Sequence, residues 1–195
     1  MDHADRCFVF TGAHGVGKSS LIRAMEYQGE RVVREAAQDV RLLMEAAGDP
    51  FPLDRDDFES RCLQLHRMRE ERARASGGTV FLDRGCLDYL AYAELGPWPL
   101  SDAERDHCRA TRYDAVFLVL PHGREWGSTL RAGEREFCER LVCELRRLYT
   151  ELGMPVYEVP AGDVWERAGW VRARCAETGQ APLRRSATSP QKAVM

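Results

Sequence analysis

Short apolar runs alternate with amphipathic segments along most of the chain. The runs whose length and composition suit buried strands lie at residues 7–10, 31–34, 79–82, 113–120 and 154–160. The intervening segments repeat apolar residues at helical spacing, most clearly at Phe137, Leu141, Leu145, Leu148 and Leu152. Strands that alternate with helices predict an α/β fold in three layers, α/β/α, around a five-stranded, mainly parallel sheet.

Local signals refine three of the predicted helices. One helix is expected to bury Val40, Leu43 and Met44 on a common face. A longer helical pattern covers residues 53–75, and Ser101 is expected to cap a further helix through a capping box.

Length and composition indicate one domain at residues 1–176, followed by a polar, proline-containing tail at 177–195 that is expected to be disordered. The net charge of -3 and a pI near 6.0 argue against a nucleic-acid or anionic-membrane partner. The sequence has no signal-peptide pattern and no apolar run of membrane-spanning length, so the cytoplasm is the expected location. Seven scattered cysteines without a Cys-x-x-Cys pair favour reduced thiols over disulfides or a zinc site.

The segment between the first strand and the first helix contains Gly12-x-x-x-x-Gly17-Lys18-Ser19. In that context the pattern predicts a phosphate-binding loop. Glycines let backbone N–H groups converge on a polyphosphate, and the helix N-terminus adds positive potential. Lys18 is expected to reach the β- and γ-phosphates, and the Ser19 hydroxyl to ligate Mg²⁺. The predicted nucleotide-binding residues are Gly12, Ala13, His14, Gly15, Val16, Gly17, Lys18, Ser19 and Ser20.

Two acidic residues follow predicted strands. In open parallel sheets ligands bind at the carboxyl ends of the strands, so Asp83 is placed to hold Mg²⁺ with Ser19 or to act as a base on an acceptor hydroxyl. A helix cap or an ion pair with Arg84 is the structural alternative. Glu35 is a second candidate base, with a carboxylate at the start of a helix as its alternative.

Five segments together resemble a family of small P-loop proteins classed as AAA-type ATPase domains, which look related to the nicotinamide-riboside kinase domain and to nucleoside kinases. The segments are "FTGAHGVGKSS", "VVREAA", "FLDRGCLDYLAY", "RYDAVFLVLP" and "ELGMPVYEVP", and the resemblance covers about residues 7–172. Its most specific parts are Asp83-Arg84-Gly85 with Asp88 and Tyr92, and then the segment at residues 112–114.

The resemblance implies a P-loop NTPase with the kinase-like fold. Glu35 matches an acidic residue that contacts or deprotonates the acceptor hydroxyl in nucleoside kinases. Asp83 and Arg84 match a pair that lies beside the acceptor and the phosphates. Residues 160–163 match the segment where related kinases hold the adenine base.

The resemblance also implies a mobile lid at residues 124–135, whose arginines close over the transferring phosphate. Arg131 and Arg135 are the candidate catalytic arginines of this lid. At one lid position where the family commonly carries an Asp, this chain has Ala132.

These features predict an enzyme that binds ATP or GTP with Mg²⁺ and transfers the γ-phosphate to a hydroxyl of a small nucleoside- or vitamin-like molecule. The predicted catalytic residues are Lys18, Glu35, Asp83, Arg84, Arg131 and Arg135, and the predicted metal ligands are Ser19 and Asp83. ATP is the expected donor because the chain lacks an Asn-Lys-x-Asp run. Two alternatives stay open: an NTP-hydrolysing switch read by a partner protein, and a non-catalytic nucleotide sensor, which Ala132 supports. A homodimer also stays open.

Two further features are assigned to solvation or packing. Residues 66–75 interleave arginines with glutamates and are expected to form a salt-bridged, solvated helix face. Tyr89, Tyr92 and Trp98 are expected to pack in the core rather than to cover an acceptor pocket.

Overall fold

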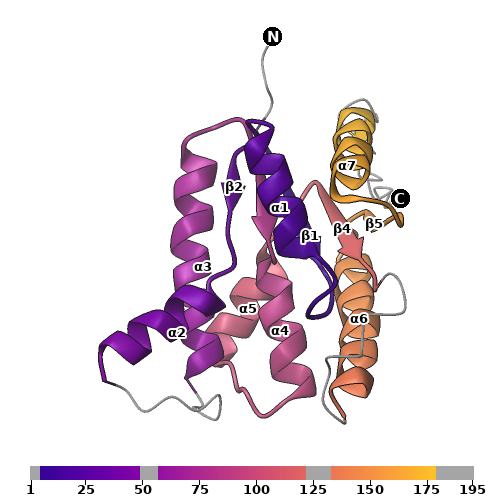
Figure 1. Cartoon of the computed structure of the whole chain (residues 1–195). Helices are drawn as coiled ribbons and strands as arrows, with labels where there is room; N and C mark the ends of the chain where they lie inside the picture. The colour runs from indigo at the N-terminus through magenta and orange to yellow at the C-terminus, as the bar shows by residue number, and fades with distance from the viewer. Residues whose placement is uncertain (1–4, 49–56, 122–132, 179–195) are drawn as a thin grey trace, which may run out of the picture.

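A computed structural model describes residues 5–48, 57–121 and 133–178 (Figure 1). The strands of the described ranges are β1 (Arg6–Thr11), β2 (Val32–Val33), β3 (Thr79–Asp83), β4 (Ala115–Val119) and β5 (Val156–Val159). The helices of these ranges are α1 (Lys18–Tyr27), α2 (Ala37–Ala46), α3 (Phe58–Ala75), α4 (Cys86–Leu95), α5 (Asp102–Ala110), α6 (Glu134–Glu151) and α7 (Val164–Thr178).

The five strands form one sheet in the order β2-β3-β1-β4-β5, and every neighbouring pair is parallel. β1 lies at the centre because its run of apolar residues can be buried on both faces. Phe8 and Phe10 point to the face covered by α1 and α7, whereas Cys7 and Val9 point to the face covered by α2 to α6. The predicted α/β fold with a parallel five-stranded sheet is confirmed.

The sequence-based element boundaries differ from the structure in small ways. β2 is only two residues long, and this edge strand pairs with β3 alone. In α2, Leu43 is 65% exposed while Val40 and Met44 are buried, so the apolar stripe of this helix is narrower than predicted. The Ser101 cap is confirmed, since its side chain accepts a hydrogen bond from the backbone N–H of Glu104.

The end of α7 and the state of the cysteines bear on two further predictions. α7 continues to Thr178, two residues beyond the predicted domain boundary, and the predicted tail otherwise lies outside the described residues. All seven cysteines are free thiols, and only Cys143 is exposed. None of the helices in the described ranges combines the length and hydropathy that crossing a bilayer requires.

Candidate active site

The glycine-rich loop between β1 and α1 adopts conformations that only glycine accommodates easily. Gly12 has a φ of 136°, and a Cβ atom at this position would lie 2.3 Å from the carbonyl oxygen of Val119 in β4. Gly17 precedes α1 with a φ of 89°. The loop therefore packs against the end of β4 and leaves the N-terminus of α1 open toward the carboxyl edge of the sheet, as an anion site requires.

Lys18 is the first residue of α1, and its side chain is buried. Its Nζ atom donates a hydrogen bond of 2.6 Å to the carbonyl oxygen of Ala13, across the loop. Burial and the nearby Arg84 charge lower the pKa of Lys18 to about 8. A bound polyphosphate would supply the missing negative charge and favour the ammonium form.

This lowered pKa predicts a measurable titration. Lys18 is one of two lysines in the chain, so 13C reductive methylation gives two lysine signals beside that of the N-terminal amine, with Lys18→Ala and Lys192→Ala assigning them. We expect the Lys18 signal to titrate near pH 8 in the nucleotide-free protein and to move to higher pH with MgATP. Nucleotide affinity should therefore be flat below about pH 8 and fall as the pH rises above it, since binding must then take up a proton. A Lys18 midpoint that nucleotide leaves unmoved would contradict contact with phosphate.

Ser19 and Asp83 meet below the loop. The Ser19 hydroxyl donates a hydrogen bond of 2.9 Å to Oδ2 of Asp83. Oδ1 of Asp83 is buried and has no hydrogen-bond partner among the described residues. Burial and the Glu35 charge raise the pKa of Asp83. An orphaned carboxylate oxygen beside a hydroxyl is the hard oxygen donor set that Mg²⁺ prefers, so the two predicted metal ligands fit this ion.

Arg84 connects the loop to the acidic residues. Its backbone has a φ of 76°, an uncommon value for a residue with a side chain, and its N–H donates to the carbonyl oxygen of Phe10 at 2.9 Å. Its buried guanidinium donates to Oε1 of Glu35 and lies 3.3 Å from Oδ1 of Asp88. It also lies over the ring of Tyr92, 5.2 Å from the ring centroid. The strained backbone directs Arg84 along the carboxyl edge of the sheet, toward the predicted acceptor side.

Two opposing influences act on the pKa of Glu35. Burial raises its pKa, but the charge and hydrogen bond of Arg84 outweigh burial, and the net shift is downward. Glu35 is thus a carboxylate at neutral pH. In this form both of its oxygens can accept a hydrogen bond from a substrate hydroxyl.

Two cavities flank Glu35. The larger, about 670 Å³, is lined by Glu35, Glu59 and Arg84 and by five aromatic side chains: Phe58, Tyr89, Tyr92, Trp98 and Phe137. The smaller, about 330 Å³, is lined by Ser19, Glu35 and Asp83. Glu35 therefore lies between the metal-ligand pair and an aromatic cavity of the size that holds a small molecule.

The aromatic residues predicted to pack in the core also line the larger cavity. Tyr89 and Tyr92 are buried in the core, as predicted, yet Tyr89, Tyr92 and Trp98 all line the larger cavity. His14 borders this cavity too, and its Nε2 atom lies 2.9 Å from the hydroxyl of Tyr92. His14 thus belongs to the acceptor side of the loop.

The predicted lid is placed only in part. Arg131 and Ala132 lie outside the described residues. Arg135 lies in the first turn of α6, where it is exposed and forms an ion pair with Glu139 at 3.1 Å, so the structure does not bring it to the cavity. Gly133, Glu134 and Phe137 from the same stretch do line the cavity.

Sequence reasoning missed two site residues. Glu59 in α3 lines the larger cavity, where burial and the charge of Glu35 raise its pKa to about 7. Arg167 in α7 is buried beside the glycine-rich loop, with Nη1 3.2 Å from the Cβ position of Gly17. Its Nε and Nη2 atoms have no hydrogen-bond partner among the described residues. Neither residue belongs to a motif, and only the helix order brings them to the site.

Comparisons with known proteins agree with this geometry. A family model described as an AAA domain matches residues 7–167. No curated protein gives a sequence match to the chain. Among solved structures, the NadR protein in complex with NR is similar with a TM-score of 0.65 and 21% identity, over 94% of this chain and 52% of that one. The chain therefore spans about half the length of NadR.

Two smaller kinases are also similar. Deoxyadenosine kinase from M. mycoides has a TM-score of 0.61 and 16% identity, over 88% of this chain and 99% of that one. Thymidylate kinase from Ehrlichia chaffeensis has a TM-score of 0.63 and 15% identity, over 89% of this chain and 99% of that one. These likenesses show that the chain has the kinase-like P-loop fold.

Proposed function

The chain belongs to the AAA domain family, and from this premise and the site geometry we propose that it is an ATP-dependent kinase of a small hydroxyl-bearing molecule. The observation that carries the proposal is the position of Glu35 between the Ser19–Asp83 pair and the aromatic cavity. A nucleotide on the glycine-rich loop would present its terminal phosphate at the metal pair, and an acceptor in the cavity would face it. A hydrolase has no need of an aromatic cavity of this size on the acceptor side.

The roles follow from the contacts. Lys18 and the N-terminus of α1 would bind the phosphates, and Arg84 would add positive charge at the transferring group. Ser19 and Asp83 would hold Mg²⁺, which when bound neutralises charge on the phosphate oxygens. Glu35 would accept the hydrogen bond of the acceptor hydroxyl and orient its oxygen toward the phosphate.

The cavity walls favour an acceptor with a flat, unsaturated ring and a sugar-like hydroxyl group. Five aromatic side chains offer stacking surfaces, while Glu35 and Glu59 offer acceptors for hydroxyl groups. Two proteins with similar folds support a nucleoside- or vitamin-like acceptor. One is a deoxyadenosine kinase, and the other is NadR in complex with NR.

The test measures ADP release from MgATP with a panel of nucleosides and vitamins. We expect one class to stimulate turnover saturably and to yield a phosphorylated product. In that assay Glu35→Gln should lower kcat by about 10²–10⁴-fold, the usual contribution of a general base. Glu45→Gln is the matched control, since Glu45 lies exposed on α2.

Two other outcomes of this assay would support a different function. A slow basal ATPase that only a protein partner stimulates would support an NTP-hydrolysing switch. Tight MgATP binding without turnover on any acceptor would support a nucleotide sensor. Either result would overturn the kinase proposal.

A further inference from the structure

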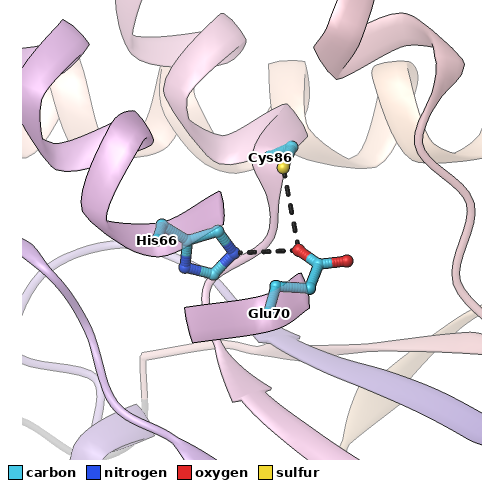
Figure 2. Close-up of side chains that lie close together, drawn as sticks. All are labelled: His66, Glu70 and Cys86. Atoms are coloured by element: carbon cyan, nitrogen blue, oxygen red, sulfur yellow. Dashed lines mark hydrogen bonds and ion pairs between the residues drawn. The ribbon is translucent and has the colours of Figure 1, made fainter. Parts of the chain in front are cut away.

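A second cluster of reactive side chains lies away from the nucleotide loop, where α3, α4 and α5 pack together. His66 and Glu70 are four residues apart and share one face of α3, and Cys86 is the first residue of α4 (Figure 2). All three are buried, and their ligand atoms lie within 4.8 Å of one another. His107 of α5 also lies near Cys86, with Nε2 3.8 Å from its Sγ.

Two of the spacings within this cluster are close to the edge length of a coordination tetrahedron. Nε2 of His66 lies 3.2 Å from Oε2 of Glu70, and Sγ of Cys86 lies 3.7 Å from the same oxygen. For Zn²⁺ bonds of about 2.0–2.3 Å, neighbouring ligand atoms of a tetrahedron lie about 3.3–3.6 Å apart. Small side-chain shifts would suffice to centre a metal ion among the atoms of His66, Glu70 and Cys86, and a movement of His107 toward them would add the fourth ligand.

His66 is incompletely satisfied without a metal ion. The side chain has no exposed surface, and its Nδ1 atom has no hydrogen-bond partner among the described residues. Its Nε2 atom lies 3.2 Å from Oε2 of Glu70 but does not form a hydrogen bond with it. A buried polar atom without a partner costs folding free energy, so this arrangement calls for a ligand of Nε2.

The surroundings hold the other ligand atoms in place. The Tyr113 hydroxyl donates to Oε2 of Glu70 at 3.1 Å and accepts from the backbone N–H of Cys86 at 2.8 Å. Arg74 donates to Oε1 of Glu70 at 2.8 Å, which leaves Oε2 directed toward His66 and Cys86. Outer contacts of this kind orient the ligands of metal sites in proteins.

We propose that His66, Glu70, Cys86 and His107 form a Zn²⁺ site that joins α3, α4 and α5. One thiolate, two imidazoles and one carboxylate form a donor set for Zn²⁺ rather than for Mg²⁺ or Ca²⁺. The site has no open position, so its role is structural. Cys86 lies between Arg84 and Asp88 in the chain, at the start of α4. A metal ion bound there would hold the start of this helix in place.

Binding requires the loss of one proton. Burial and the Glu70 charge raise the pKa of the Cys86 thiol to about 12, so the metal-free protein carries the Sγ–H bond. When Zn²⁺ binds, that bond breaks, the Sγ–Zn bond forms and the proton leaves to solvent. A cavity of about 260 Å³ borders the proposed site, because Glu70 and His107 line it together with Arg67, Arg74 and Arg112.

The test uses the whole chain, treated with a chelator and then dialysed into Mg²⁺ without nucleotide. One equivalent of Co²⁺ should produce a thiolate-to-cobalt charge-transfer band and the intense visible bands of a tetrahedral site. Zn²⁺ should abolish these bands and raise the Tm. Cys86→Ser should lose the charge-transfer band, and Cys143→Ser, at an exposed position, should keep it.

A second variant keeps the test informative if Cys86→Ser fails to fold. His107 is only partly buried, so His107→Gln should fold and weaken Zn²⁺ binding by about tenfold or more. Absence of the charge-transfer band in the unsubstituted chain, its survival in Cys86→Ser, or an unchanged affinity in His107→Gln would each overturn the proposal. These readouts use no nucleotide or acceptor, so they stand apart from the kinase proposal.

Discussion

Lys18→Ala should lower nucleotide turnover by about 10²–10³-fold or more, the cost of removing one charged group that stabilises the transition state. The structure gives the reason, because the Lys18 side chain crosses the glycine-rich loop. Its Nζ atom lies 2.6 Å from the carbonyl oxygen of Ala13. Burial and the nearby Arg84 charge depress its pKa, and a phosphate beside Nζ would favour the charged form. Turnover of MgATP by the purified variant, with the best acceptor found, measures the effect.

The fold should survive this substitution. The alanine removes a buried charge that has no carboxylate hydrogen bond, so circular dichroism and the Tm should change little. Lys192→Ala is the matched control, since it removes the only other lysine and should leave turnover unchanged. Turnover retained in Lys18→Ala would show that the loop does not bind the reacting phosphate, and the enzymatic assignment would fail with it.

The parts of this protein that the sequence predicts are those encoded locally. Apolar runs bounded by turns predicted all five strands, because a buried parallel strand needs little beyond a short hydrophobic segment. The glycine-rich loop between β1 and α1 was predictable for a similar reason, since its glycines and Lys18 lie within seven residues of one another in the chain. The structure then placed Asp83 next to Ser19 because β3 lies beside β1 in the sheet.

The aromatic cavity was less predictable because it is assembled from distant segments. Glu59 and Arg167 reach the site only through the packing of α3 and α7, and no motif marks either residue. The helix face at residues 66–75 shows the same limit. Its i, i+4 pairs are present, as Arg74–Glu70 and Arg67–Glu71, but His66 and Glu70 are buried against α4 rather than solvated.

Asp88→Ala should destabilise the protein by about 3–5 kcal/mol, the cost of breaking a buried ion pair and leaving its other hydrogen-bond donors unmet. Asp88 has no exposed surface and accepts hydrogen bonds from the Thr11 and Tyr149 hydroxyls, each at 2.7 Å. It also accepts from the backbone N–H of Gly85 and lies 3.3 Å from the Arg84 guanidinium. One carboxylate thus ties the ends of β1 and β3 to α6, and its loss leaves several buried donors unmet.

Urea unfolding of Asp88→Ala, Asp88→Asn and Asp106→Ala separates charge, hydrogen bonding and background effects. Asp106 is exposed on α5, so Asp106→Ala should stay within about 0.5 kcal/mol of the unsubstituted chain. Asp88→Asn keeps an acceptor oxygen but loses the charge beside Arg84, so it should fall between the other two variants. The midpoint should move while the m-value stays constant, because the surface exposed on unfolding is unchanged. A loss below about 1 kcal/mol in Asp88→Ala would mean that Arg84 is held by Glu35 alone, and the carboxylate network would then not be what positions it.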